Sequence, residues 1–403
     1  MILANGKIYD TSRQDEVLDG LEAALNRTLA EKTLRPEQVI AAIDRLGRRL
    51  DGGEFDHLLS QVDQAERYLA QIRPQLTRQA LEYKLRVELG TDTAPYVTTP
   101  PAGLPALTVR PAPLGVLLHI AAGNVDGLPA YSVVEGLLTG NINLLKLPQA
   151  DSGLSIEILR YLMEEEPTLA DFLYVFDTPS EDVDALLRMA KLSDGVVVWG
   201  GDGAVSAVRR FAPPGVKLIE WGHRLSFSYL SGAQDRERDW PALARHIIET
   251  RQLLCSSCQV IYLDTHSQED VHTFCRDFLP LLEQAVTQGP ARSLSVAAEQ
   301  ALRRYQIRIE RAISGQASTD ERTVYDGAGC SLTACTDREL ELSDLFGNPL
   351  VKALPREELL PVLRRQKGRL QTAGLLCPEG DRAALTDLLV RAGVTRVLPA
   401  AEM

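Results

Sequence analysis

The sequence predicts an α/β protein in which a doubly wound parallel sheet that binds a nucleotide is followed by a second α/β domain. Three observations support this prediction. From residue 115 onward, short apolar runs alternate with stretches of helical periodicity, the runs are apolar at consecutive positions, and glycine or polar residues follow several of them. Strands that are apolar on both faces belong to parallel sheets covered by helices on each side, and such sheets bind nucleotides at the carboxyl ends of their strands.

The part of the chain before residue 115 has a different pattern. Residues 15–90 are predicted to form three or four amphipathic helices, because apolar residues recur at helical spacing in 17–32 and again in 35–50. Residues 91–113 are rich in proline and threonine, so they cannot remain helical for long. We expect this stretch to be a linker that leads into a strand near Ala106–Arg110.

Five apolar runs predict the strands of the first sheet, and helical patterns separate them. These runs are residues 115–123, 142–148, 172–176, 195–200 and 216–221. The polar segment 231–236 contains turn-forming residues and predicts a domain boundary. We expect residues 1–234 to form the amino-terminal helices and a Rossmann-like domain, and residues 235–378, which include a helical pattern over 294–313, to form the catalytic domain. The pattern leaves open which domain contains residues 379–403.

The composition narrows the class of protein. The formal net charge is −12, so neither a nucleic acid nor an anionic membrane surface is an expected partner, because both require a basic surface. No segment approaches the roughly 18 consecutive apolar residues of a membrane span. The first residues also lack the basic and apolar stretches of a secretory signal. We therefore expect a cytoplasmic protein whose six cysteines are reduced thiols.

Cys255 and Cys258 form a C-x-x-C pair that has three possible chemical roles. A redox pair is disfavoured, because the motif does not open a helix after the first strand of a small domain. A zinc site usually needs about four ligands, and the spacing of Cys330 and Cys335 is a poor match for the second half of one, so we expect no metal. The third role is a nucleophile beside a second thiol. At this point a buried structural cysteine remains an equal alternative.

Several residues that could bind a ligand follow the ends of predicted strands. Asn124 lies just past the first strand, and Lys146 lies at the end of the second. Gly200 and Gly201 follow another strand and open a helix whose N–H groups could face phosphate. Each residue taken singly is weak evidence, because a glycine after a strand is usually a turn and a lone lysine is usually on the surface. His119 is expected to be a core histidine with satisfied hydrogen bonds.

Five segments, in their order along the chain, resemble the aldehyde dehydrogenase superfamily: GVLLHIAAGN, LLKLP, VVVWGG, LIEWG and QLLCSSCQ. Within that superfamily the sequence is similar to the LuxC family of acyl-CoA reductases over roughly residues 105–400. The resemblance implies an aldehyde-dehydrogenase-like fold. It also implies an oxidoreductase that uses NADPH to reduce an acyl-CoA, or an acyl group on a carrier, to the aldehyde through an acyl-cysteine intermediate.

The resemblance implies roles for the residues in these segments. Cys255 would be the nucleophile that carries the acyl group as a thioester. Asn124 would donate, together with the backbone N–H of Cys255, to the developing oxyanion. Lys146 would bind the adenosine ribose of the cofactor, and Gly200 and Gly201 would let its pyrophosphate approach the backbone.

Three further positions match the superfamily less completely. Glu220 corresponds to the general base of hydrolytic aldehyde dehydrogenases, but a thioester reductase needs no activated water, so a solvated glutamate is an equal alternative. Residues 344–351 resemble the segment whose acid and aromatic ring position the nicotinamide riboside. Asp344 replaces the usual glutamate there, and Phe346 could equally be a core residue.

Gln149 carries the expectation about the cofactor. In the superfamily that this sequence resembles, a glutamate at the corresponding position can bind the adenosine hydroxyls, and its carboxylate would repel the extra phosphate of NADPH. Gln149 is neutral and can donate to a phosphate oxygen, and Lys146 adds a positive charge nearby. We therefore expect NADPH to be preferred, with NADH as the alternative.

Two other activities are compatible with the same residues. An aldehyde dehydrogenase that oxidises aldehyde to acid would need Glu220 to activate water. A cysteine acyltransferase or thioesterase would form the acyl-cysteine without using its nucleotide site. For partners, the resemblance implies an acyl-CoA or acyl-carrier thioester as substrate, allows an acyl-transferring partner enzyme, and suggests a homodimer.

Overall fold

The computed structural model divides the chain into two compact units, Met1–Gly222 and His223–Met403, which are described separately. The described residues are 1–60, 72–89, 96–122, 127–149, 151, 153–232, 235–289 and 322–403, with isolated positions between 298 and 313. The predicted helix at 294–313 and the candidate residue Asn124 therefore lie largely or wholly outside the described residues.

The first unit contains a seven-stranded sheet in the order β2-β1-β7-β6-β5-β8-β9. Its strands are β1 (Ile2–Ala4), β2 (Lys7–Tyr9), β5 (Val116–Ile120), β6 (Ile142–Lys146), β7 (Leu173–Phe176), β8 (Gly195–Trp199) and β9 (Lys217–Trp221). The five strands from β5 to β9 are parallel, which confirms the predicted architecture. The antiparallel hairpin of β1 and β2 is not predicted from the sequence, because strands of three residues are too short to show a periodicity.

Helices accompany the first sheet, and the first four of them in the list below correspond to the amino-terminal helices predicted from periodicity. They are α1 (Gln14–Glu31), α2 (Pro36–Asp51), α3 (Asp56–Leu59), α5 (Arg78–Leu89), α6 (Leu128–Leu138), α7 (Leu154–Glu165), α8 (Val183–Lys191) and α9 (Asp202–Phe211). Leu144 and Leu145 are consecutive in β6 and therefore point to opposite faces of the sheet, and neither has exposed surface. Burial on both faces explains why these strands are apolar at consecutive positions.

The strand expected near Ala106–Arg110 is shorter and pairs elsewhere. It is β4 (Thr108–Val109), and it forms a separate two-stranded antiparallel sheet with β3 (Tyr96–Val97). The proline-rich connection therefore forms a hairpin and does not lead directly into the large sheet.

The second unit contains another seven-stranded sheet, in the order β12-β13-β14-β11-β10-β15-β16. Its strands are β10 (Leu225–Leu230), β11 (Cys258–Leu263), β12 (Arg322–Gly327), β13 (Cys330–Cys335), β14 (Leu350–Ala353), β15 (Leu370–Leu376) and β16 (Arg396–Pro399). Six of them run parallel, and β12 is antiparallel to β13. The sheet is thus of the same mostly parallel kind as the first one.

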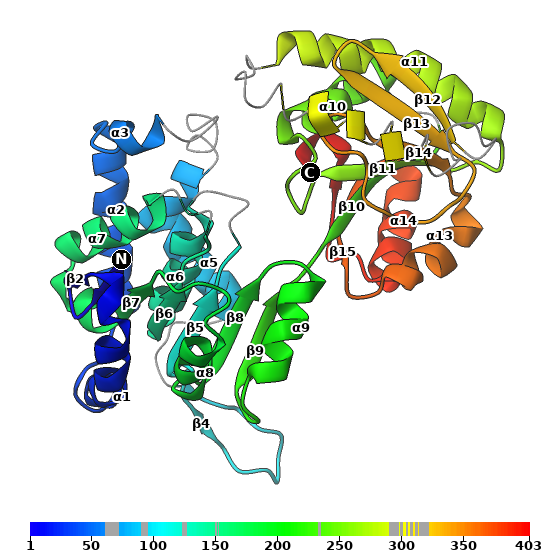
Figure 1. The fold of residues 1–403 in the computed structure, drawn as a ribbon. Coiled ribbons are helices and arrows are strands. Elements are labelled where there is room, and N and C mark those ends of the chain that lie inside the picture. The colour runs from blue at the N-terminus through cyan, green and yellow to red at the C-terminus, as the bar shows by residue number, and fades with distance from the viewer. Residues whose placement is uncertain are drawn as a thin grey trace. The chain divides into compact units, whose positions relative to one another are not determined.

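Two pairs of helices cover the two faces of the second sheet (Figure 1). One face packs against α10 (Arg236–Thr250) and α11 (Gln268–Gln288), and the other against α13 (Arg356–Leu363) and α14 (Glu379–Ala392). Successive residues of β11 enter the two cores alternately: Ile261 lies on the α10 side and Tyr262 on the α13 side, both fully buried. No described helix is both long and apolar enough to cross a lipid bilayer.

The boundary between the units lies between Gly222 and His223, earlier than the polar segment 231–236. The reason is that β10 pairs with both β11 and β15, so its residues belong to the interior of the second sheet. Residues 379–403, whose membership the sequence left open, supply α14 and β16 to the second unit. Strand neighbours that are distant in sequence decide both assignments, and a local pattern cannot show them.

Candidate active site

Lys146 is held at the carboxyl end of a strand in the first unit. It is the last residue of β6 and is only 4% exposed, and its Nζ donates a hydrogen bond to Ser180 Oγ at 2.9 Å. Burial lowers the pKa of this ammonium group, while the carboxylates of Glu181 and Asp177 act in the opposite direction. Lys146 is therefore a mostly buried ammonium group at the carboxyl end of β6, beside the hydroxyl group of Ser180.

Gly200 and Gly201 connect β8 to the amino end of α9. A Cβ at Gly200 would lie 2.9 Å from the Cβ of Ala204, so the first turn of α9 approaches closely enough to require glycine. A Cβ at Gly201 would meet no atom within 4 Å, and no side chain caps the helix. The turn into α9 is therefore open at Gly201 and carries no side-chain cap. Asp202 in the first turn places one acid near this space.

Two tryptophans that the sequence pattern did not indicate lie at the same edge of the first sheet. Trp199 ends β8 and Trp221 ends β9, and their rings stack at a centroid distance of 5.0 Å and an interplanar angle of 14°. The indole N–H of Trp199 donates to Ser132 Oγ at 2.9 Å, which fixes that ring, while Trp221 remains 48% exposed. Each tryptophan lies at the end of a predicted strand, and this shared position in the sequence is the signal that could have indicated the pair.

Glu220 is bound by an arginine within the same unit. The guanidinium of Arg209 in α9 donates to both carboxylate oxygens, with Nε–Oε1 at 2.5 Å and Nη2–Oε2 at 2.6 Å. The hydrogen bond from Arg209 lowers the pKa of Glu220. A carboxylate that is held ionised in this way is a weaker base for activating water. No feature of the sequence indicated this pairing.

His119 is a core residue, as the sequence predicted. It is 1% exposed, and its ring nitrogens lie 2.7 Å from Ser132 Oγ and 3.0 Å from Asn143 Oδ1. Burial lowers its pKa to about 4, although the hydrogen bond with Asn143 acts in the opposite direction. His119 is therefore a neutral, hydrogen-bonded part of the interior near neutral pH.

Gln149 follows β6 and is exposed. Its amide nitrogen lies 3.4 Å from a carboxylate oxygen of Glu181. A negatively charged side chain that the local sequence did not indicate is therefore close to Gln149, the residue expected to select between NADPH and NADH. The charge around position 149 therefore depends on Glu181 as well as on the neutral Gln149.

Cys255 lies in the loop between α10 and β11 of the second unit. All six cysteines are in the described part of the chain, and Cys255 alone is exposed. Ser226 Oγ donates to the carbonyl oxygen of Cys255 at 2.7 Å. Cys258, by contrast, is fully buried at the start of β11, and burial raises the pKa of its thiol to about 12. The C-x-x-C pair therefore consists of one accessible sulfur and one structural sulfur.

A buried glutamine fastens the loop that carries Cys255. Gln252 is 1% exposed and has a left-handed backbone, with φ of 60°. Its amide nitrogen donates to the Cys258 carbonyl at 2.8 Å and to Ser343 Oγ at 2.9 Å. Its amide oxygen accepts from the backbone N–H groups of Gly347 at 3.0 Å and Asn348 at 2.9 Å. One side chain thus joins the Cys255 loop to the segment that contains Asp344 and Phe346.

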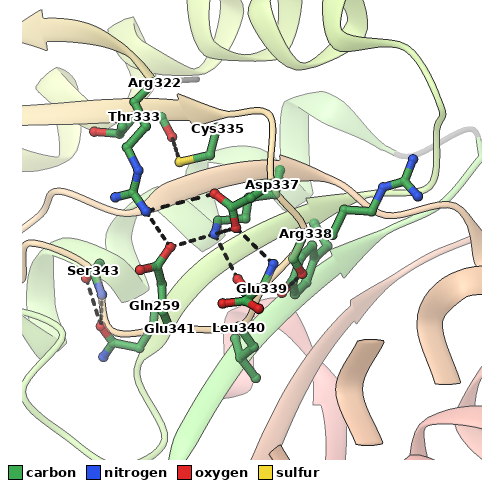
Figure 2. A network of polar contacts seen from close by, with 12 residues as sticks. Gln259, Arg322, Thr333, Cys335, Asp337, Arg338, Glu339, Leu340, Glu341 and Ser343 are labelled. Carbon is green, nitrogen blue, oxygen red and sulfur yellow. Dashed lines mark hydrogen bonds and ion pairs between the residues drawn. The ribbon is translucent and has the colours of Figure 1, made fainter. Parts of the chain in front are cut away.

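The segment after β13 is fixed by a second set of polar contacts (Figure 2). Gln259 binds both the N–H and the hydroxyl of Ser343, at 3.2 and 2.8 Å. The fully buried Lys352 donates to Glu341 at 2.7 Å and also to Asp337. Gln259 also donates to the carbonyl of Gln252 at 2.8 Å, so Gln252, Gln259 and Ser343 form one connected set of contacts beside that of Lys352.

Asp344 and Phe346 lie at the end of this segment, just before β14. Phe346 is 7% exposed, and its N–H donates to the carbonyl of Arg251 at 2.8 Å. Residues 345–347 all have positive φ, which strains the backbone at the two non-glycine residues, Leu345 and Phe346. Such a backbone persists only when surrounding contacts enforce it. The roles of both residues toward a cofactor stay predictions.

Among the described residues, no group of three or more His, Cys, Asp or Glu side chains is arranged to hold an ion. Cys255 and Cys258 are both free thiols.

Two solved dehydrogenases share this architecture. The NADP-dependent glyceraldehyde-3-phosphate dehydrogenase of Bacillus halodurans C-125, solved with NADP, matches with a TM-score of 0.73 and 14% identity over 99% of this chain and 90% of its own. An NAD-dependent benzaldehyde dehydrogenase from Corynebacterium glutamicum matches with a TM-score of 0.65 and 14% identity, also over 99% of this chain and 90% of its own. The predicted aldehyde-dehydrogenase-like fold is confirmed.

The family follows from the sequence itself. The family model described as acyl-CoA reductase (LuxC) matches residues 32–403, and the chain belongs to this family. Long-chain acyl-protein thioester reductases of Aliivibrio fischeri and Vibrio harveyi are each 26% identical, over 157 and 165 residues. These matches cover 38% and 40% of this chain and 33% and 35% of the relatives, so they span about a third of the relatives' length. The predicted family resemblance is confirmed.

Proposed function

We propose that this protein reduces an acyl thioester to the aldehyde with NADPH, through an acyl group carried on Cys255. The observation that carries the proposal is the exposed Cys255 sulfur in a loop fastened by buried side chains, within a chain of the acyl-CoA reductase (LuxC) family. The substrate is an acyl-CoA or an acyl group on a carrier protein. The relatives named as acyl-protein thioester reductases support this substrate class.

The chemistry begins at Cys255. Its thiolate attacks the carbonyl carbon of the substrate thioester, the new carbon–sulfur bond forms, and the thiolate of CoA or of the carrier leaves. The backbone N–H of Cys255 and the amide of Asn124 are proposed to donate to the oxyanion. After hydride reaches the same carbon, the thiohemiacetal collapses, the bond to Cys255 breaks, and the aldehyde is released.

A nicotinamide dinucleotide bound by the first unit would supply the hydride. Lys146 and Ser180 would face the adenosine ribose, and the open turn at Gly200 and Gly201 would receive the pyrophosphate. Asp344 and Phe346 are proposed to position the nicotinamide riboside. NADPH is the proposed cofactor and NADH the alternative, because Gln149 is neutral but Glu181 lies beside it.

The Arg209–Glu220 pair favours reduction over oxidation to the acid. An aldehyde dehydrogenase needs a base to activate water against the acyl-enzyme, and the lowered pKa of Glu220 makes that carboxylate a weak base. A reductase gains from the same arrangement, because hydrolysis of the acyl-enzyme would waste the substrate. Glu220 is therefore assigned no proton transfer in the proposed reaction.

The decisive experiment measures NADPH and NADH oxidation with a series of acyl-CoAs of different chain length, for the wild type and Cys255→Ala. We expect aldehyde formation by the wild type and none by the variant. Acyl-enzyme formation without cofactor oxidation would instead support an acyltransferase or thioesterase. Faster turnover with aldehyde and NADP⁺ yielding acid would support an aldehyde dehydrogenase.

We propose a homodimer as the assembly and the cytoplasm as its location. An acyl-transferring enzyme is a possible partner that would deliver the acyl group. Size-exclusion chromatography with light scattering tests the assembly, and a monomer at micromolar concentration would reject the dimer.

A further inference from the structure

The amino end of β15 brings a second polar side chain to Cys255. Gln371 is the second residue of this strand, and its amide Nε2 lies 3.3 Å from the Sγ of Cys255. The two residues are 116 positions apart in the chain, so only the folded sheet brings them together. An amide N–H can donate to a sulfur, and it donates more strongly when the sulfur is a thiolate.

The backbone on both sides of this contact is fixed. The carbonyl of Gln371 accepts from the N–H of Thr395 at 3.1 Å and from its Oγ1 at 3.0 Å. Ser226 Oγ accepts from the N–H of Thr372 at 3.0 Å and donates to the carbonyl of Cys255 at 2.7 Å. Ser226 thus ties the start of β15 to the Cys255 loop, and the Gln371 amide is held opposite the sulfur.

We propose that Gln371 is a catalytic residue that donates a hydrogen bond to the Cys255 thiolate at the two moments when this thiolate carries charge. The proposal rests on the proposed function. The first moment precedes attack on the substrate thioester. The second follows hydride transfer, when the carbon–sulfur bond of the thiohemiacetal breaks and its electron pair returns to Sγ. A carboxamide suits both moments, because it does not ionise near neutral pH and therefore donates equally well throughout that range.

The magnitude of the effect is set by two opposing tendencies. A hydrogen bond to a charged group changes the population of the charged form by roughly tenfold or more. A stabilised thiolate is also less nucleophilic, with a Brønsted slope of about 0.4–0.5, so about half of that effect on a logarithmic scale remains in the rate. Removing the donor should therefore slow a reaction of Cys255 by about threefold to tenfold.

The test compares the alkylation of Cys255 by iodoacetamide in the full-length wild type, Gln371→Met and Gln371→Glu at one neutral pH, with mass spectrometry of the Cys255 peptide as readout. Methionine keeps the length of the side chain without the donor, and glutamate keeps its shape but places a negative charge by the sulfur. We expect Gln371→Met to react about threefold to tenfold more slowly and Gln371→Glu more slowly still. Gln366→Met is the matched control, since the amide of Gln366 donates to the Leu340 carbonyl instead.

The order wild type, Gln371→Met, Gln371→Glu from fastest to slowest supports the proposal, and any other order overturns it. A role in shape alone would leave Gln371→Met, which keeps the length of the side chain, as fast as the wild type, which is why this variant is decisive. Alkylation requires neither an acyl thioester nor a cofactor. The proposal about Gln371 can therefore fail while acyl reduction is observed, and acyl reduction can be absent while the order of alkylation rates holds.

Discussion

The two sheets present their candidate residues at opposite ends of their strands. In the first unit, Lys146 ends β6, and Gly200 and Gly201 follow β8. In the second unit, Cys255 precedes β11 and Gln371 lies at the start of β15. The first set thus lies at the carboxyl edge of a parallel sheet and the second set at the amino edge.

The two sets of candidate residues are held in position by different kinds of contact. At the carboxyl edge of the first sheet, a strand end and the amino terminus of α9 place the residues, and helical N–H groups are part of the arrangement. At the amino edge of the second sheet, the chain arrives through loops with positive φ. Buried amides of Gln252 and Gln259 tie those loops together. The first arrangement is made mainly by backbone, and the second depends on particular side chains.

The largest expected effect separates the two cysteines at the amino edge. Cys255→Ala should abolish labelling by a radioactive acyl-CoA, because it removes the exposed sulfur. Cys258→Ala should keep the label, because that thiol is fully buried and burial raises its pKa to about 12. Gel-based detection of the label in both variants provides the measurement. Label retained in Cys255→Ala would place the acyl group elsewhere.

Replacement of Gln252 tests whether the amino edge depends on side chains. Gln252→Met should lower the free energy of unfolding by about 3 kcal/mol, because it leaves the buried N–H groups of Gly347 and Asn348 and the Cys258 carbonyl without their partner. Urea denaturation of each variant gives the value. Acylation of Cys255 should also slow.

The control for this prediction is Gln366→Met, which removes a single hydrogen bond to the Leu340 carbonyl and should cost about 1 kcal/mol or less. Equal losses in the two variants would show that the network around Gln252 has no special importance.

His119 allows the contribution of a buried side chain in the first unit to be measured through the pH dependence of the free energy of unfolding. Its pKa in the folded protein is lowered from 6.5 to about 4, so between these values the unfolded chain binds a proton that the folded chain does not. The free energy of unfolding should therefore fall as the pH drops through this window, by up to about 3 kcal/mol, and this loss should be absent above it. Denaturant titrations at several pH values measure the slope.

His119→Phe should flatten that slope, while His266→Phe should keep it, because the side chain of His266 is 69% exposed. Cofactor binding at neutral pH should change little in His119→Phe if backbone geometry positions the carboxyl edge. An unchanged pH slope in His119→Phe would assign the acid sensitivity to other groups.

The smallest expected effect concerns the choice of cofactor at the carboxyl edge. Gln149→Glu should weaken NADPH relative to NADH by about 1–2 kcal/mol, because a second carboxylate would join that of Glu181 near the proposed position of the extra phosphate. Glu181→Gln should shift the preference in the opposite direction. The ratio of kcat/KM for the two cofactors measures both changes, and an equal ratio in all three proteins would show that neither residue selects the cofactor.

The sequence alone determined the parts of this protein that depend on local pattern. Consecutive apolar residues predicted the buried parallel strands from β5 to β9, since burial on both faces leaves no polar alternation. Lys146 was located correctly at a strand end, because the end of an apolar run marks the edge of a sheet. Cys255 was singled out through its family motif, and the family assignment is confirmed.

Only the tertiary structure decided which distant residues meet. The domain boundary lies at Gly222–His223 and not at the predicted segment 231–236, because β10 pairs with β11 and β15. No local sequence pattern encodes this strand pairing. The binding of Glu220 by Arg209 depends on side-chain directions on two different elements. Gln371 meets Cys255 because two parallel strands begin at the same edge of the sheet. Local sequence constrains backbone conformation and burial, but contacts between elements arise only when the whole sheet has assembled.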